Sequence, residues 1–293
     1  MEETIKNNVW LISNKNVVVK KLEKTKFANP FSENEQKKLL ELMGLKNDSY
    51  NGVSVRLDRV TEKNFEISKV GFFDFILTNN LYHNRKKFLN YSICNSDKVA
   101  LVNKIINIVE INGLNDFSDV VDNSNLANII AVSILIEDKN GNVGIVKRSK
   151  NVLISSGFFS STVTGSLNEQ DFKNRNPLLA CAKREIEEEL GLTDIELQYK
   201  SIVMSKKKLQ PIVLYNAKLN VSWEDIIKDI KNAKEYSSEI NIFYSVPVIN
   251  IKDFMFIENF TDAVKYHLCL KYKEKYEDIE KTTENIDNNK FIL

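Results

Sequence analysis

The sequence predicts an α+β fold, in which strands and helices are mixed along the chain. Three observations lead to this class. Asn140-Gly141, a strong two-residue hairpin signal, separates two β-rich runs. The segment 176–191 has the apolar spacing, the N-cap and the stop residue of a helix. The 293 residues contain no regular strand–helix–strand alternation, so a doubly wound parallel sheet is not expected.

The first 125 residues are expected to form an α+β segment. Two strands are expected in "VWLISNKNVVVKKL", on either side of its NKN turn, and two more in "GVSVRLDRV" and "NFEISKVGFFDFIL". A helix is predicted in "FSENEQKKLLELMGL", because Ser32 and Glu35 form a capping box and Gly44 suits the stop. Ser96 is expected to cap a second helix, "SDKVALVNKIINIVEING".

Residues 126–293 are expected to form a second domain. It opens with the predicted hairpin, "IIAVSILIEDKNGNVGIVKRS", followed by a polar loop and the helix over 176–191. Strands are expected in "IELQYKSIVMS", "QPIVLYNAKLNV" and "INIFYSVPVINI". Further helices are expected over 223–233 and 261–280.

Charge and cysteine usage narrow the classes of function. A net charge of +1 gives no electrostatic reason to expect a nucleic-acid polymer or a membrane surface as partner. The start, "MEETIKNNVWLIS", lacks the apolar part of a secretory signal, and the longest apolar run, "IIAVSILI", is far short of a membrane span. Cys94, Cys181 and Cys269 form no C-x-x-C pair and, with His83 and His267, no zinc spacing. We therefore expect buried thiols, core or surface histidines and a reducing, cytoplasmic compartment.

The stretch "REIEEELGL", residues 184–192, places acidic residues where a helix tolerates them least. A helix C-terminus carries partial negative charge and favours cations. Glu185, Glu188 and Glu189 follow the spacing i, i+3, i+4, which puts three carboxylates on one face. A solvated acidic face is the ordinary interpretation of such a run. Mg²⁺, or alternatively Mn²⁺, would offset the repulsion and explain the position of the cluster.

This stretch resembles the core of the Nudix box, a pattern written G, five residues, E, seven residues, R-E-U-x-E-E-x-G-U with U aliphatic. Every specified position from Arg184 to Leu192 matches. The upstream half departs from the pattern, because Gly165 would open the box and Asp171 stands where Glu is expected. Twelve residues, rather than seven, separate Asp171 from Arg184, which indicates an insertion, "DFKNRN".

The resemblance covers about residues 127–275 and implies an α/β/α sandwich with a mixed sheet. It also implies a metal site on the helix. Glu188 and Glu189 would be the main ligands. Glu185 would be a ligand or would activate water, with Arg184 orienting it.

The resemblance further implies that Gly165 offers a backbone carbonyl to the metal. Asp171 would be the acid that precedes the helix, and Glu169 is the alternative in the same loop. Metal-assisted attack on phosphorus often uses another acid, for which the loop "AKEYSSEIN" offers Glu239. Arg148 and the lysines of "SKKKLQP" are either solvated or cations that clamp a phosphate.

"YNGVSVRLDRV" and "VGFFDFILTNN" resemble the N-terminal part of the Nudix branch related to UDP-sugar pyrophosphatases. This likeness implies that Asn51, Arg56 or Asp74 contacts the substrate beside Phe72 or Phe73. The alternative is structural, with core aromatic residues and a turn at Asn51.

Two functions follow from these patterns. The first is a metal-dependent pyrophosphohydrolase acting on a nucleoside diphosphate linked to another group, such as a UDP-sugar cleaved to UMP and a sugar 1-phosphate. ADP-ribose and a dinucleotide are open as substrates. The second is a Nudix-like module that binds a nucleotide without cleaving it, which the departure at Asp171 and the inserted loop would favour.

Overall fold

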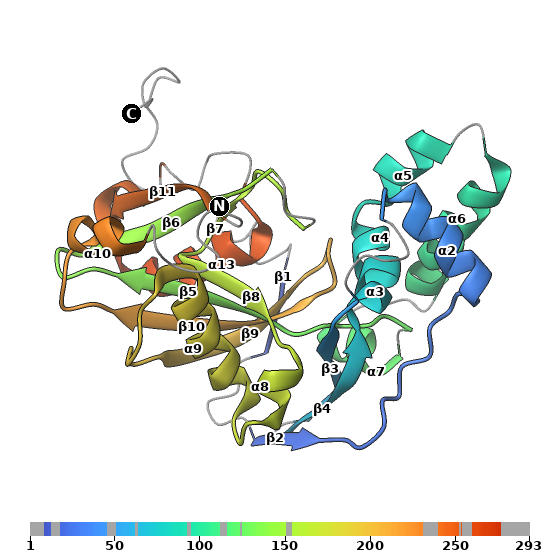
Figure 1. Cartoon of the computed structure of the whole chain (residues 1–293), viewed down its shortest axis with the longest axis horizontal. Helices are drawn as coiled ribbons and strands as arrows, with labels where there is room; N and C mark the ends of the chain where they lie inside the picture. The colour runs from blue at the N-terminus through green and yellow to red at the C-terminus, as the bar shows by residue number, and fades with distance from the viewer. Residues whose placement is uncertain are drawn as a thin grey trace.

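The structure, a computed structural model, describes residues 9–12, 18–45, 51–61, 64–92, 95–111, 116–123, 125–150, 154–230, 240–251, 253 and 260–276. It has the expected α+β architecture, with a large mixed sheet between helices and a smaller sheet beside a group of helices (Figure 1). None of the helices in these ranges is long and apolar enough to cross a membrane.

The large sheet has the order β1-β9-β10-β5-β6-β11, with β8 paired to β5 and β7 paired to β6. Its β10–β5 pair is parallel, whereas its other neighbours are antiparallel. The strands are β1 (Val9–Ile12), β5 (Ala131–Glu137), β6 (Asn142–Arg148), β7 (Phe159–Ser160), β8 (Val163–Ser166), β9 (Gln198–Ser205), β10 (Pro211–Lys218) and β11 (Ile240–Pro247). The helical elements of this part are α8 (Glu169–Lys173), α9 (Pro177–Leu190), α10 (Trp223–Ile230), η2 (Val248–Asn250) and α13 (Asp262–Tyr276).

Helices cover both faces of the large sheet. Successive side chains of a strand point to opposite faces. Along β5, Ile134 and Ile136 join the cluster that contains the apolar stripe of α9. The intervening Leu135 joins a second cluster, which contains the apolar residues of α13. The two helices therefore pack on opposite faces, as in the expected α/β/α sandwich.

The N-terminal part combines a three-stranded sheet of order β2-β4-β3 with a group of helices. Its strands are β2 (Val18–Lys21), β3 (Val53–Val60) and β4 (Asn64–Gly71). Its helical elements are α2 (Glu33–Leu42), α3 (Phe72–Phe75), η1 (Ile76–Asn80), α4 (Leu81–His83), α5 (Arg85–Ser92), α6 (Ser96–Ile111) and α7 (Phe117–Asn123). The element η1 is a π-helix, in which all five residues are buried.

Several local predictions are confirmed. Ser32 and Glu35 form the capping box of α2, and Gly44 adopts a positive φ of 73° after it. Gly141 has φ 81° in the turn between β5 and β6. Asp138 stabilises that turn by accepting hydrogen bonds from the backbone N–H groups of residues 140 and 142.

Two predictions in the N-terminal part are wrong. "FFDFIL" is helical rather than the end of a strand, because Gly71 begins a capped turn in which Asp74 accepts its N–H at 2.9 Å. The N-cap of α6 is Asn95 rather than Ser96, since Asn95 Oδ1 accepts the N–H of Lys98 at 3.0 Å. Burial of both faces hides the helical period of the first segment from a sequence pattern.

The division of the chain into two parts at residue 125 remains a prediction. Strand β1 lies before this residue, whereas its partner strand, β9, lies after it. Val9 pairs with Ser205 across the β1–β9 ladder, so β1 belongs to the large sheet, while β2 belongs to the small one. One hydrophobic cluster also runs from Phe31 to Ile226. The two parts of the chain therefore share a core as well as a sheet edge.

Backbone hydrogen bonds join the small sheet to the large one. Val55, on β3, donates its N–H to the Leu167 carbonyl at 3.1 Å and accepts from the N–H of Ile130 at 2.9 Å. Leu57 donates to the Asn128 carbonyl at 3.1 Å. The strand β3 thus runs along both the entry to β5 and the loop that follows β8.

A fully buried asparagine, Asn79, fixes this junction from the helical side. Its Nδ2 donates to the Leu209 carbonyl at 2.6 Å, and its Oδ1 accepts the N–H of Asn128 at 3.1 Å. Asn128 and Leu209 have positive φ values of 44° and 54°. Because non-glycine residues seldom adopt such values, the hydrogen bonds from Asn79 stabilise two strained turns at once.

We predict that Asn79→Ala destabilises the protein by about 3 kcal/mol, since it leaves two buried backbone groups without their partners. The measurement is the urea midpoint of unfolding. Asn84→Ala is the matched control, because the Asn84 side chain bonds one turn back, to Asn80, at a half-buried position. Equal midpoints for the two variants would contradict the structural role of Asn79.

Candidate functional site

The helix α9 presents three of its four glutamates inward. Asn176 caps it by accepting the N–H of Leu179, and Gly191 ends it with a φ of 67°. Glu185 and Glu189 are only 6% and 2% exposed, whereas Glu187 is exposed. Glu188 is intermediate, with 22% of its side chain exposed. The acidic run is therefore not one solvated face, and the residue that points to solvent is the one that the Nudix pattern leaves unspecified.

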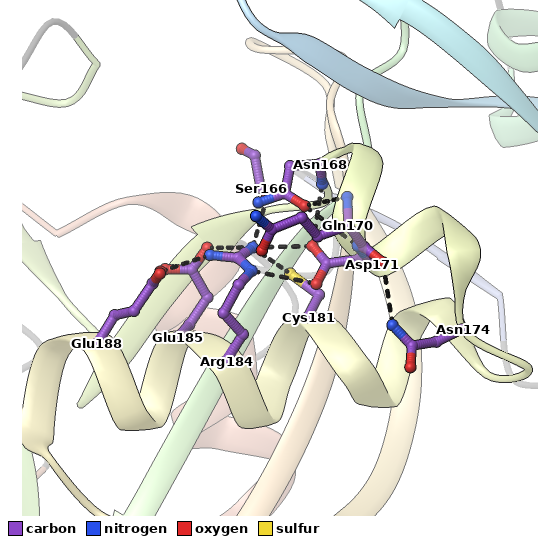
Figure 2. A network of polar contacts seen from close by, with 9 residues as sticks. All are labelled: Ser166, Asn168, Gln170, Asp171, Asn174, Cys181, Arg184, Glu185 and Glu188. Carbon is purple, nitrogen blue, oxygen red and sulfur yellow. Dashed lines mark hydrogen bonds and ion pairs between the residues drawn. The ribbon is translucent and has the colours of Figure 1, made fainter.

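Arg184 lies at the centre of the site and contacts three carboxylates (Figure 2). Its Nε and Nη2 donate to the two oxygens of Asp171 at 3.1 and 2.8 Å, a bidentate arrangement. Nη2 lies 2.8 Å from Glu185 Oε1, and Nη1 donates to Glu188 Oε2 at 2.7 Å. Nη2 also donates to the Ser166 carbonyl at 3.2 Å, which ties the guanidinium to β8.

The electrostatics of Arg184 follow from this arrangement. Burial alone lowers the pKa of the guanidinium, but the hydrogen bonds that it donates to Asp171 and the charge of Glu185 outweigh this effect and raise the pKa above its ordinary value. Arg184 therefore stays a cation at any accessible pH. One guanidinium is shared by three carboxylates, and a divalent cation would add positive charge that a single arginine does not supply.

Asp171 is placed for Arg184 by the short helix α8. Asn168 caps that helix, with Oδ1 accepting the N–H groups of Gln170 and Asp171. In return, Asp171 Oδ2 accepts the N–H of Asn168 at 3.0 Å, which completes a capping box. The carboxylate of Asp171, which is 2% exposed, thus bonds its own helix and the guanidinium together.

Gly165 accommodates the carboxylate of Glu185. A Cβ atom at this position would overlap the carboxyl carbon and both oxygens of Glu185, so any other residue would displace this carboxylate. Next to it on β8, Thr164 donates its N–H to Glu189 Oε1 at 3.3 Å. The strand β8 and the helix α9 therefore hold two buried carboxylates against one short stretch of backbone.

The donors of this site suit a hard divalent cation, since they are carboxylate and carbonyl oxygens. The cradle at Gly165, which the Glu185 carboxylate fills, brings a backbone strand and a buried acid together. In the described part of the chain, no three acidic, histidine or cysteine side chains converge as a ready metal-binding group. In this arrangement Glu185 and Glu188 instead contact Arg184.

The structure separates the two acids of the inserted loop. Asp171 contacts Arg184, whereas Glu169 forms an exposed ion pair with Lys69 at 2.6 Å. Asp171 is therefore the acid that joins the site. It reaches Arg184 although the insertion lies between the two residues. Glu239, the other predicted acid, lies outside the described residues.

Two basic side chains approach the site from the end of the large sheet. Arg148 donates from Nη1 to Thr164 Oγ1 at 2.7 Å, next to the bond between Thr164 and Glu189. Lys208 lies in the turn between β9 and β10, with its Nζ 5.9 Å from the centre of the Phe75 ring. Burial, with repulsion by Arg148, lowers the pKa of Lys208 to about 7.

Asn51 and Asp74, predicted as substrate contacts, hold the start of α3. Asn51 Oδ1 accepts the N–H of Phe73 at 2.7 Å. Asp74 accepts the N–H of Gly71 at 2.9 Å and an N–H of the Asn29 side chain at 2.6 Å. These polar atoms cap a helix, which agrees with the structural alternative for this segment.

Arg56, the third predicted contact, is 3% exposed. It pairs with Asp58 and donates from Nε to the Leu126 carbonyl at 3.3 Å. Burial lowers its pKa, and the charge of Asp58 opposes that shift. The Arg56 guanidinium is therefore part of the junction between the two sheets.

Three further candidate side chains, Cys181, Cys269 and His267, are structural. Cys181 and Cys269 are buried thiols, whereas Cys94 lies outside the described residues. His267 is fully buried between Ser133 Oγ at 3.1 Å and Asn216 Oδ1 at 3.0 Å. Burial lowers its pKa well below the ordinary value, so it is a neutral core histidine.

Some residues of the site were not predicted from the sequence. The Ser166 carbonyl and the Thr164 N–H act through the backbone, which a residue pattern does not register. The role of Asn168 could have been predicted from the sequence, because Asn168-x-x-Asp171 has the spacing of a capping box. That spacing predicts a short helix in the insertion and a fixed position for Asp171.

No protein-family model and no curated protein matches the chain. Several solved structures do. A mutT/nudix family protein from Listeria innocua is 15% identical, with a TM-score of 0.38, over 53% of this chain and 98% of its own. The NUDIX domain of Shewanella oneidensis NrtR, solved with ADP ribose, is 11% identical, with a TM-score of 0.38, over 51% of this chain and 89% of its own. The MutT protein of Methanosarcina mazei Go1 is 19% identical, with a TM-score of 0.32, over 53% and 96%. The chain is thus similar, over about half of its length, to solved proteins that carry the Nudix or MutT name.

Proposed function

We propose that this protein is a Nudix-type, metal-dependent hydrolase that cleaves the diphosphate bond of a nucleoside diphosphate derivative. One observation carries the proposal. Arg184 joins Asp171 to Glu185 and Glu188, so the box motif and the loop before it act as one unit despite the insertion. The enzyme needs such a unit because its acids must be held close together against their own repulsion.

The acids of α9 would hold the cation. Glu185, Glu188 and Glu189 would supply carboxylate oxygens, and Gly165 a carbonyl oxygen. Mg²⁺ or Mn²⁺, when bound, would offset the charge of the diphosphate and make it more susceptible to attack. Glu185, which Arg184 orients, would take the proton from the attacking water.

The rest of the reaction follows from that proton transfer. The water oxygen forms a bond to phosphorus, and the bridging P–O bond breaks. Arg148 and Lys208 would bind phosphate oxygens at the end of the large sheet. Two phosphorylated products result, UMP and a sugar 1-phosphate if the substrate is a UDP-sugar.

The rival function is a module that binds a nucleotide without cleaving it. Two departures from the Nudix pattern supported this rival function, the aspartate at position 171 and the inserted loop. The bidentate contact between Asp171 and Arg184 weakens that support, because the shorter acid still reaches the guanidinium. We therefore favour the enzyme.

The substrate is proposed to bind where the N-terminal part of the chain meets the large sheet. Lys208 lies beside Phe75 there, and the lysine turn is tied to Asn79. A UDP-sugar is the proposed substrate, on the resemblance of the N-terminal segment. ADP-ribose and dinucleotides are the alternatives.

A panel of nucleotide sugars, ADP-ribose and dinucleotides, assayed by phosphate release with added phosphatase, tests the function. We expect Mg²⁺-dependent release from at least one compound. Binding of a nucleotide without release from any of the compounds would favour the rival function.

Glu188→Gln tests the metal site. We expect a loss of activity of at least about 100-fold in Mg²⁺, because an amide is a poor ligand for a hard cation. The fold should persist, since the amide oxygen still accepts from Arg184 and an i,i+4 pair contributes only about 0.5 kcal/mol. Glu187→Gln, at the exposed neighbour, is the control and should retain activity. Near-normal turnover of the Glu188 variant in Mg²⁺ would contradict the assignment of Glu188 as a metal ligand.

Arg184→Lys tests the orienting role. Lysine keeps the charge but cannot form the fork to Asp171, so we expect kcat to fall roughly 10- to 100-fold with little change in KM. Arg184→Ala is less informative, since losing a partly buried cation among three acids costs about 3 kcal/mol of stability. A change confined to KM would make Arg184 a substrate contact instead.

Lys208→Gln tests the phosphate contact. Below pH 7 the Lys208 amine is protonated, and above it the charge is lost, so the wild-type KM should rise between pH 6 and pH 8. Arg148 and His83 are the neighbouring basic groups. The variant should have a higher KM at pH 6 and a flatter profile. Lys206→Gln, in the same turn beside Trp10, is the control. Matching profiles for Lys208→Gln and wild type would exclude the contact.

A further inference from the structure

We infer that the small N-terminal sheet positions the acid that orients the box arginine. This inference rests on the proposed function and adds a role for residues outside the Nudix-like part. The positioning residues are Phe172 and Lys69, with Lys21 beside them. None of them lies at the reacting atoms, and each acts through Asp171.

The inserted helix α8 lies against the three-stranded sheet (Figure 1). Two ammonium groups lie over the ring of Phe172, Lys21 Nζ at 5.4 Å and Lys69 Nζ at 5.5 Å from its centre. Lys69 also pairs with Glu169 at 2.6 Å, and Lys21 donates to the Asn174 carbonyl at 2.8 Å. Two strands, β2 and β4, therefore hold the two ends of one short helix.

The third strand, β3, holds the approach to α8. Val55 donates to the Leu167 carbonyl at 3.1 Å, and Ser54 forms a bridge with Asn168. Asn168 is the cap of α8 and bonds Asp171 directly. Each strand of the small sheet thus contacts the segment 167–174.

A helix as short as α8 needs such support. An isolated helix of five residues is unstable in water, because it has too few hydrogen bonds to offset the ordering of its first turn. Without the sheet, Asp171 would lose its fixed position beside Arg184. Glu185 and Glu188 would then lose the orientation that Arg184 gives them.

A comparison with the Nudix pattern explains why Asp171 needs support from the small sheet. In the pattern seven residues separate the first acid from the arginine. Here twelve residues, which include the end of α8 and the start of α9, lie between Asp171 and Arg184. The small sheet adds a constraint on α8 from outside this longer connection.

The test compares four full-length variants, Phe172→Ala, Phe172→Tyr, Lys69→Met and Lys20→Met. Lys20 is the matched control, because it pairs with Glu66, on the same sheet, at 3.1 Å. The readouts are hydrogen exchange of residues 167–174 in metal-free protein, the Mn²⁺ dissociation constant and the urea midpoint.

We expect Phe172→Ala to speed exchange in 167–174 roughly 10-fold, since both cation–π contacts and the ring packing are lost. Its Mn²⁺ dissociation constant should rise by a similar factor. Lys69→Met should have a smaller effect of roughly 3-fold on both. Phe172→Tyr should restore wild-type values, and Lys20→Met should change neither. Urea midpoints of Lys69→Met and Lys20→Met should agree.

Unchanged exchange in Phe172→Ala overturns the inference, and so does faster exchange with unaltered Mn²⁺ affinity. If the wild-type chain binds no Mn²⁺, the proposed function fails instead. The exchange rates of 167–174 then decide by themselves whether the sheet holds this segment.

Discussion

The candidate site depends on a single guanidinium. Arg184 contacts the inserted loop, the strand β8 and two acids of its own helix. A planar, permanently charged fork can do this, whereas a lysine offers only a point charge. The acids of α9 can approach one another because this cation lies among them. This contact links Asp171, Glu185 and Glu188 to one another.

The N-terminal part of the chain is structurally inseparable from this arrangement. It contributes an edge strand to the large sheet, a common hydrophobic cluster and the buried Asn79 that stabilises two strained turns. Ligand sites often form between such parts, where polar groups from each side can converge. The basic turn at Lys208 and the loop at Asp171 both contact N-terminal residues.

Features encoded by neighbouring residues could be predicted from the sequence. The hairpin at Gly141, the capping box at Ser32 and the limits of α9 all depend on short-range hydrogen bonds and φ preferences. The grouping of the glutamates followed from helix geometry. Burial of both faces concealed the helix after Gly71. The pairing of Asp171 with Arg184 and the use of Asn51 as a cap depend on segments brought together only by the fold.

The placement of β1 has a consequence for synthesis. Val9–Ile12 is the edge of the large sheet, yet its partner on β9 lies at residues 202–205. On the ribosome, this apolar strand therefore emerges long before the strand that will cover it. Contacts so far apart in sequence slow folding and leave an unpaired strand open to wrong partners in the interval. Strand β1 can therefore take its place in the sheet only after β9 has been synthesised.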